Sequence, residues 1–213
     1  MKLISQLFLS LCLSVSFAAG SFAADEAPDV LIKRLSQEII DIAKSDKDIQ
    51  SGNQKRVFDL VESKILPHID FPRMTSLAAG KSWRDANAEQ QKQLIKEFRT
   101  LLVFTYSGAI SQIKDQRMEF KPFRGAPDDT EVEVKTQVIQ TRGEPLQLSY
   151  RLEKLATGWK IYDINVLGAW LVETYKGSFA AEVSKSGVDG LIKVLVEKNK
   201  KLAANGSGKT ASK

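Results

Sequence analysis

The sequence predicts an α+β protein in which amphipathic helices lie before and after a single antiparallel sheet. Three observations indicate this class. Apolar residues recur at helical spacing through the N-terminal half and again near the C-terminus. Between these parts, four segments alternate apolar and polar residues, which is typical of strands. Short, turn-rich links join the four segments, so neighbouring strands must run antiparallel.

The chain begins with the features of a secretory signal peptide. Lys2 precedes an apolar run from Leu3 to Ala19, and a small-x-small cleavage pattern ends at Ala23. The alternative is a membrane anchor, but the run is interrupted by serines and is too short for a comfortable span. We therefore expect residues 1–23 to be a signal peptide that is removed on export.

Three shorter helices are predicted next. One begins at Pro28 and carries an apolar stripe, and the polar stretch 45–53 ends it. A second helix stops at Pro67, because proline cannot continue a helix. A third, short helix covers 74–79 and ends at Gly80. Each has one apolar face, so all three are expected to pack against a common core.

The longest predicted helix covers 88–113. Asn87 precedes it and Gln90 follows three positions later, which is the pattern of a capping box. The apolar face of this helix is broad and runs through Phe98 and Leu102. We expect this helix to lie across the apolar face of the sheet.

Four strands are predicted between the helical parts. Their segments read RMEFKPF, TEVEVKTQVIQ, PLQLSYRL and WKIYDINV. In the fourth, strict alternation would turn Tyr162, Ile164 and Val166 to one face and Ile161 and Asp163 to the other. The prediction is a four-stranded antiparallel meander with one apolar face and one wet face.

Two helices, 169–185 and 188–203, are predicted to close the chain. They complete a single domain over 24–203, and residues 204–213 are expected to form a disordered tail.

The composition argues against an enzyme, a metal site and nucleic-acid binding. The net charge is +5 with charges mostly interspersed, and His68 is the single histidine. The one cysteine, Cys12, lies in the predicted signal peptide. The sequence GSGKT at 206–210 imitates a phosphate loop but has Ala203 where the first glycine would stand, and no strand precedes it. A binding protein is the interpretation that remains.

Several segments together carry a resemblance to a known family. They are ILPHIDFPRMTSLAAGKSW (65–83), EQQKQLIKEFRTLLVFTYSGAI (89–110), GWKIYDINVLG (158–168) and GVDGLI (187–192). In this order and spacing they resemble the MlaC family of periplasmic phospholipid carriers, also called the toluene-tolerance or ABC-transporter auxiliary family. The resemblance implies an NTF2-like curled sheet covered on one face by helices, with a helical subdomain that encloses an apolar pocket.

The resemblance also implies a function and partners. The cargo would be phospholipid, held by its acyl tails, with no cofactor. The protein would be a periplasmic monomer that shuttles lipid between an outer-membrane lipoprotein (MlaA-like) and an inner-membrane ABC transporter with an MCE-domain subunit (MlaD-like). Such transport would maintain the lipid asymmetry of the outer membrane. A pocket for two tails would need roughly 1,000 Å³, the upper end of the usual range.

The predicted lipid-binding residues come from the inward face of the sheet, the long helix and the turn after the fourth strand. Each could equally be plain core. They are Phe98, Leu102, Tyr106, Val132, Val134, Leu146, Leu148, Tyr150, Ile164, Val166, Ala169, Leu171, Val172 and Tyr175. Trp170 departs from the small or polar residues usual in the family, and if it lay at the entrance it would change the size of the pocket.

Two other functions remain open from the sequence. An enzyme on an NTF2-like cone could use Asp163 and Tyr150 for proton chemistry, although strand parity puts them on opposite faces unless a bulge intervenes. An interaction module could dock a partner helix on its apolar stripe; an exposed groove would favour this function over a carrier.

The facing assignment of the sheet gives a first prediction. A charge at an inward position, Leu148→Glu, should abolish retention of lipid during purification, because a buried carboxylate without a partner is costly. Gln137→Glu, on the predicted wet face, should leave lipid bound. Lipid extraction followed by mass spectrometry measures both, and equal lipid in the two proteins would show that the facing assignment is wrong.

Overall fold

The structure, a computed structural model, describes residues 26–141 and 143–208. The predicted signal peptide, 1–23, lies outside the described residues, as do 209–213 of the predicted tail. Helices make up the first half of the described chain. They are α1 (Pro28–Ser45), α2 (Lys47–Gln50), α3 (Gln54–Leu60), the π-helical segment η1 (Val61–Ile65), the 3-10 helix η2 (Leu66–His68), α4 (Phe71–Ala79), α5 (Lys81–Asp85), α6 (Ala88–Tyr106) and the 3-10 helix η3 (Ser107–Gln112).

One antiparallel sheet follows, in which the strands pair in sequence order. The strands are β1 (Arg117–Phe120), β2 (Glu131–Ile139), β3 (Leu146–Leu155), β4 (Gly158–Val166) and β5 (Ala169–Trp170). The helix α7 (Leu171–Gly208) closes the described chain. The α+β class and the antiparallel meander are therefore confirmed, with one more strand than predicted.

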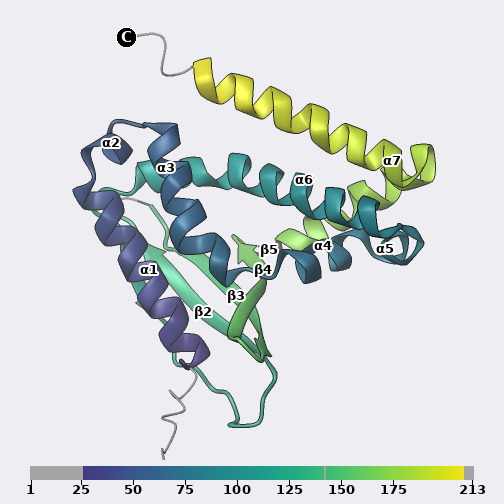
Figure 1. Cartoon of the computed structure of the whole chain (residues 1–213). Coiled ribbons are helices and arrows are strands. Elements are labelled where there is room, and N and C mark those ends of the chain that lie inside the picture. Colours follow the sequence, from purple (N-terminus) through teal and green to yellow (C-terminus); the bar gives the residue numbers. More distant parts are fainter. Residues whose placement is uncertain (1–25, 142, 209–213) are drawn as a thin grey trace, which may run out of the picture.

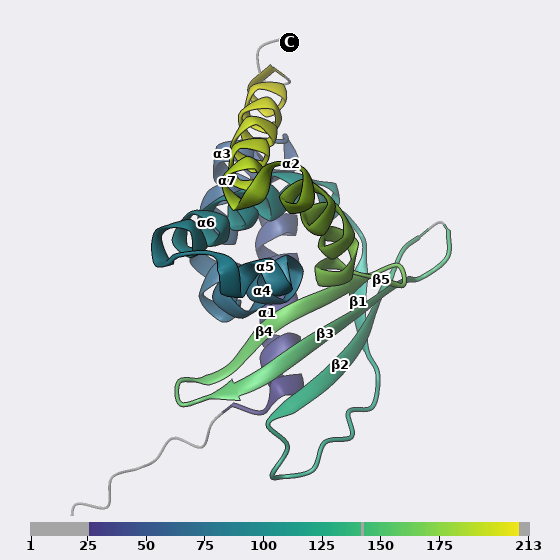
Figure 2. The same cartoon turned by 90° about the vertical axis from the view of Figure 1, so that its right-hand side faces the viewer.

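The helices gather on one side of the sheet, as Figure 1 and Figure 2 show. Helix α1 lies across the inner face of the sheet, while α4, α5, α6 and α7 form a separate layer beside β4 and β5. The opposite face of the sheet carries no helix in Figure 2 and is the wet face. This arrangement agrees with the prediction that helices cover one apolar face.

The short strand β5 stands where the sequence predicted the start of a helix. Leu167 and Gly168 both have positive φ, 54° and 87°, and form the two-residue turn between β4 and β5. Ala169 and Trp170 then pair with Val166 and Asn165 before α7 begins. The turn uses a leucine in a conformation that costs a non-glycine residue energy, which periodicity alone does not reveal.

A β-bulge in β4 breaks the predicted alternation. Arg151 of β3 pairs with Asp163, but Leu152 pairs with Ile161, so Tyr162 is an extra residue in β4. The bulge turns Ile161 to the same face as Ile164, which corrects the predicted facing of this strand. Both isoleucines pack with the apolar residues between α1 and the sheet. Asp163 stays on the opposite face, beside Arg151.

The long helix forms as predicted at its start and ends earlier than predicted. The Asn87 side chain accepts from the Gln90 amide at 2.9 Å, and Gln90 Oε1 accepts from the Asn87 amide at 3.0 Å, so the capping box is confirmed. The α-helix ends at Tyr106 and continues as the tighter η3 rather than running to residue 113. At the C-terminus, the two predicted helices are both present within α7, because Gly187, with φ 72° and ψ −178°, is not helical and divides it. The second helix runs past residue 203 to Gly208.

The apolar residues form three cores. The upper core joins α4, α6 and α7, and its buried residues are Phe71, Met74, Ala78, Leu94, Phe98, Leu101, Leu102, Leu171, Val172, Phe179, Leu191, Ile192 and Leu195. The sheet core joins α1 to the inner face, through Leu31, Ile32, Leu35, Val134, Leu152 and Ile161. The lateral core joins α1, α2, α3, η1 and η3, through Ala43, Ile49, Val57, Leu60, Val61 and Ile110.

A polar cluster ties α4 to the wet face of the sheet. Glu131 and Glu153 are cross-strand neighbours, and two like charges in this position would repel. Arg73 of α4 pairs with both carboxylates, the contact to Glu131 being 2.8 Å, and its guanidinium lies 3.9 Å above the ring of Tyr162. The Tyr162 hydroxyl donates to Glu131 at 3.0 Å. The bulge residue thus anchors a helix of the upper core to the sheet.

This cluster predicts how stability depends on pH. Hydrogen bonds from Arg73 and then from Tyr162 hold the pKa of Glu131 below its usual value. A carboxylate with a lowered pKa in the folded state contributes stability above its usual pKa of about 4.3, and this stability is lost as pH falls through the folded pKa. We expect Glu131→Gln to be less stable than the parent at pH 7 and to lose less further stability on acidification. Urea unfolding between pH 7 and pH 3 measures this.

Glu133 provides the control for that experiment. It lies on the same strand face and pairs with Lys135 at 3.5 Å rather than with α4. If Glu133→Gln and Glu131→Gln change the acid profile equally, the contribution of the α4 cluster is refuted.

Candidate functional site

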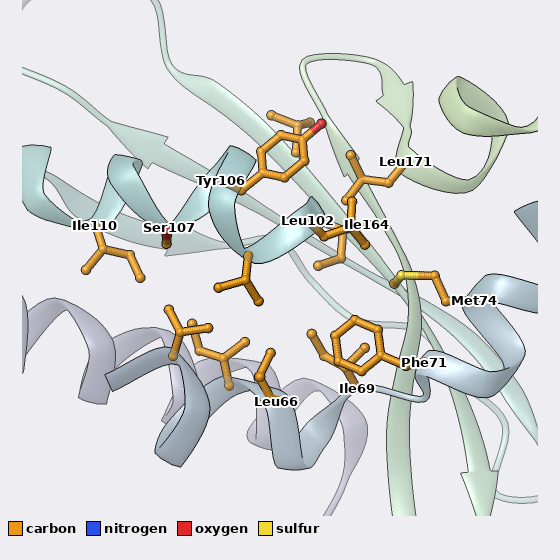
Figure 3. Close-up of a pocket in the computed structure, with 14 residues that line it drawn as sticks. Leu66, Ile69, Phe71, Met74, Leu102, Tyr106, Ser107, Ile110, Ile164 and Leu171 are labelled. Carbon is orange, nitrogen blue, oxygen red and sulfur yellow. The ribbon is translucent and has the colours of Figure 1, made fainter. Parts of the chain in front are cut away.

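An apolar cavity lies where the three cores meet. Its volume is about 220 Å³, and it is drawn in Figure 3. The lining side chains are Val61, Ile65, Leu66, Ile69, Phe71, Met74, Leu102, Val103, Tyr106, Ser107, Ile110, Ile164, Val166 and Leu171. Phe71, Leu102 and Leu171 belong to the upper core, whereas Val61 and Ile110 belong to the lateral core. The cavity is the space left between these separately packed groups of side chains.

The cavity is almost free of polar groups. Among the described residues that line it, only Tyr106 and Ser107 carry a side-chain oxygen or nitrogen. In Figure 3 the Tyr106 hydroxyl points away from the apolar side chains below it. The Tyr106 side chain is also 38% exposed, so the cavity reaches the surface beside this residue. Such a space suits hydrocarbon.

Part of the cavity wall comes from segments without regular α geometry. Helix α3 changes into the π-helical η1 and then into the 3-10 helix η2, and α6 changes into η3. Between them these irregular segments supply Val61, Ile65, Leu66, Ser107 and Ile110 to the wall. Mid-helix changes of this kind are frequent at functional sites and hinges.

The opposite wall is held to the edge of β4 by two backbone contacts and one side-chain hydrogen bond. Ile69 forms a bridge with Ile161, and the Asp70 amide donates to the Ile161 carbonyl at 2.8 Å. Lys160 Nζ donates to the Pro67 carbonyl at 2.7 Å. The cavity therefore has one pinned side, along β4 and α4, and one side made of irregular helix.

An aromatic cluster closes the upper end of the site. Phe98 lies 5.0 Å from the ring of Tyr175 and 5.1 Å from that of Phe179, both in edge-to-face geometry. Burial raises the pKa of Tyr175 to about 12, with the neighbouring Tyr106 adding to the shift, so Tyr175 is a neutral phenol at pH 7. These three rings pack in the upper core with Leu171 and do not line the cavity themselves.

Five of the predicted site residues line the cavity: Leu102, Tyr106, Ile164, Val166 and Leu171. Three others, Phe98, Val172 and Tyr175, pack in the upper core, and Val132, Val134 and Tyr150 pack in the sheet core. Leu146 and Leu148 are half-buried on β3, with Leu148 between Thr136 and Val166, and Ala169 is exposed.

The wall from η1 to α4 is the part that periodicity missed. Ile65, Leu66, Ile69 and Phe71 line the cavity, yet the predicted helices were given no role in the pocket at this point. The available signal was the crowding of apolar residues around Pro67, where no single helical stripe continues. Apolar residues that do not continue a helical periodicity in this connection line the cavity instead of forming the apolar face of one helix.

Trp170 does not line the cavity. Its ring lies 3.8 Å from the guanidinium of Arg151, on the wet face of the sheet. The departure at this position therefore leaves the cavity unobstructed.

The arrangement separates the residues that an enzyme would need. Tyr150 pairs with Ile164 and faces the sheet core, whereas Asp163 pairs with Arg151 on the opposite face. Neither side chain lines the cavity. Within residues 26–141 and 143–208, no three His, Cys, Asp or Glu side chains gather closely enough to hold a metal ion, and no helix is both long and apolar enough to cross a membrane.

Comparison with known proteins identifies the family. The family model described as MlaC protein matches residues 33–197. This chain belongs to the MlaC family. It is 24% identical over 193 residues to the intermembrane phospholipid transport system binding protein MlaC of Haemophilus influenzae, covering 86% of this chain and 87% of that protein. It is 25% identical over 167 residues to the toluene tolerance protein ttg2D of Pseudomonas putida, covering 78% and 77%.

A solved structure of a phospholipid-binding protein is more similar in sequence than these two relatives. The phospholipid-binding protein from Ralstonia solanacearum, in complex with a phospholipid, is 45% identical and superposes with a TM-score of 0.79. The match covers 84% of this chain and 99% of that one.

The cavity predicts opposite effects for the same substitution at two neighbouring positions. Val61 lines the cavity, so the additional methylene of Val61→Ile has space and should stabilise by about 0.8 kcal/mol. Val57 is in the lateral core, 3% exposed, and does not line the cavity, so Val57→Ile should destabilise by about 1–3 kcal/mol. Urea unfolding of the lipid-free proteins measures both; the same sign for both would show that the cavity is filled.

Proposed function

We propose that this protein is a periplasmic phospholipid carrier that holds acyl tails in the cavity. The observation that supports this most directly is an apolar cavity at the junction of three cores, in a chain 45% identical to a protein solved with a phospholipid. In this proposal residues 24–203 are the lipid-binding domain and residues 1–23 the export signal. Phospholipid is the cargo and no cofactor takes part.

The energetic case for a carrier rests on the cost of exposing acyl tails. A two-tailed lipid has about 30 methylenes, each worth about 0.8 kcal/mol, so the free lipid in water is disfavoured by more than about 20 kcal/mol. A protein that moves such a lipid through water must replace the apolar environment almost completely. The headgroup can stay in water, which fits a cavity whose wall is apolar and which reaches the surface at Tyr106.

The cavity must widen to take this cargo. An engineered cavity of about 150 Å³ holds one benzene molecule, so about 220 Å³ accommodates only part of one acyl chain. By the slope of about 24 cal/mol per Å³, an unfilled space of this size costs about 5 kcal/mol, whereas one of roughly 1,000 Å³ would cost more than a typical domain's stability. We therefore propose that the lipid-free protein is contracted and that tails enter by separating the lateral core from the upper core.

The irregular helices provide the wall that yields. Segments η1 and η3 are not regular α-helix, while η2 and the wall along β4 are pinned by the contacts of Ile69, Asp70 and Lys160. Movement of the lateral side would widen the joint without breaking the sheet. The residues proposed to contact the tails are those that line the cavity, together with Leu148 beside Val166.

The proposed route joins two membranes. The carrier would receive or deliver lipid at an outer-membrane lipoprotein (MlaA-like) and at an inner-membrane ABC transporter with an MCE-domain subunit (MlaD-like). The support is the family, whose named members include an intermembrane phospholipid transport protein. This transport would maintain outer-membrane lipid asymmetry.

The experiment that tests this function is native mass spectrometry of the protein purified from cells without detergent. We expect a bound mass that organic extraction releases and identifies as phospholipid. Protein that is lipid-free from cells and takes up no phospholipid from vesicles would overturn the proposal.

A matched pair of charge substitutions tests the site. Val166 lines the cavity near the end of β4, so a carboxylate from Val166→Glu would meet hydrocarbon, which is unfavourable by several kcal/mol. We expect this protein to lose its lipid while keeping its circular dichroism spectrum. Ser149→Glu lies on the wet face opposite Lys135 and should retain lipid.

Ser149 is a better control than Gln137. The Gln137 amide donates to Glu119 at 2.7 Å, so Gln137→Glu would place two carboxylates together for reasons unrelated to lipid. If Val166→Glu retains as much lipid as Ser149→Glu, the cavity is not where the tails bind.

A further inference from the structure

Helix α7 begins at a residue that cannot cap it. Trp170 immediately precedes Leu171, the first residue of α7, and so occupies the N-cap position. The first amides of a helix have no intrahelical acceptor and need one from a side chain or from water. The indole of tryptophan carries only a donor, so Trp170 cannot supply that acceptor.

The missing acceptor comes from β4. Asp163 Oδ1 accepts from the Val172 amide, in the first turn of α7, at 3.0 Å, and from the Ile164 amide at 2.9 Å. The Asp163 side chain is only 2% exposed, and burial raises the pKa of this carboxyl while the bonds from Val172 and Ile164 oppose the shift. A buried carboxylate needs such partners, and the positive end of the helix is a further favourable neighbour.

Arg151 and Trp170 complete the arrangement on the wet face. Arg151 Nη1 lies 3.6 Å from Asp163 Oδ2, and the same guanidinium stacks on the Trp170 ring at 3.8 Å. The guanidinium is thus shared between the carboxylate that caps α7 and the residue that precedes α7. Asp163 faces outward next to an inward Ile164, as alternation requires, and it lies opposite Arg151 in the register of β3 and β4.

The two backbone amides that donate to Asp163 lie at or next to residues that line the cavity. One belongs to Ile164, and the other belongs to the residue after Leu171; Ile164 and Leu171 both line the cavity. A single carboxylate on the outside of the sheet therefore fixes the spacing of two side chains on the inside. Val172, which it also holds, is buried in the upper core.

We infer that Asp163 is a positioning residue for the lipid site, with Arg151 and Trp170 as its support: it caps α7 from β4 and thereby sets the wall formed by Ile164 and Leu171. This inference rests on the proposed function. It predicts that removing the cap accelerates lipid release more than a destabilising substitution elsewhere in the protein does. Asp163 acts through other residues and does not touch the cargo.

The test compares Asp163→Ala with Asp163→Asn in the full mature protein. Loss of an N-cap acceptor should raise the hydrogen-exchange rate of the Val172 amide about tenfold in Asp163→Ala. It should also raise, several-fold, the rate at which bound lipid passes to vesicles of phosphatidylethanolamine and phosphatidylglycerol. Asp163→Asn keeps the acceptor oxygen, so both rates should stay within about twofold of the parent.

A rescue variant separates capping from general destabilisation. Serine at an N-cap accepts from the first-turn amides, so Trp170→Ser added to Asp163→Ala should restore most of the protection of Val172 and slow lipid release again. Ile32→Val, in the sheet core at 2% exposure, serves as a destabilised control that leaves α7 capped. It should release lipid at the parent rate.

Two results would overturn the inference. One is an unchanged Val172 exchange rate in Asp163→Ala, which would show that the carboxylate does not cap α7. The other is equal acceleration of lipid release in Asp163→Ala and Ile32→Val, which would show that stability alone controls release. A parent protein that binds no lipid would instead refute the proposed function, and the Val172 exchange rate would still decide whether Asp163 is the cap.

Discussion

The architecture depends on one extra residue in β4. The bulge at Tyr162 reverses the parity of the strand, so that Ile161 and Ile164 both face inward. The same bulge turns Tyr162 toward Arg73 of α4 and leaves Asp163 pointing at the start of α7. Without it, a strictly alternating strand could not contribute to two cores on one face and hold two helices from the other. The contact of Tyr162 with α4 and the contact of Asp163 with α7 therefore originate in two adjacent residues.

The cavity follows from having three cores instead of one. Each core is filled with side chains of its own helices, and the joint between them stays open at about 220 Å³. A space at a joint can widen by moving one core relative to another, whereas a space inside a close-packed core would require that core to be disrupted. The location of the irregular segments η1 and η3 on the side of the lateral core agrees with this picture. It offers a physical way for one chain to be stable with and without a large apolar cargo.

Membership of the MlaC family and the geometry of the site support the same function independently. The family and its named relatives indicate phospholipid. The chemistry of the wall, apolar apart from Tyr106 and Ser107 among the described residues, indicates hydrocarbon without reference to any relative. The separation of Asp163 from Tyr150 by the sheet removes the one proton-transfer pair that the sequence had offered.

The sequence by itself determined what depends on neighbours along the chain. The start of the long helix with its capping box of Asn87 and Gln90 and the alternation in β2 are local, and both appeared where the residues predicted them. Local signals also sufficed for the fold class and, through the order of several segments, for the family. Five of the residues predicted from these apolar faces line the cavity.

Only the tertiary structure decided where the apolar surfaces meet and where they part. Whether Phe98 fills a core or Leu102 lines a cavity depends on competition among helices that are distant in sequence, and both residues lie on the same stripe. The bulge at Tyr162 and the strand β5 arise likewise from contacts with α4 and α7, which periodicity within a strand does not record. The periodicity of the chain indicates which residues face a core. Whether a cavity remains depends on how helices and strands distant in sequence pack together, and only the tertiary structure determines that packing.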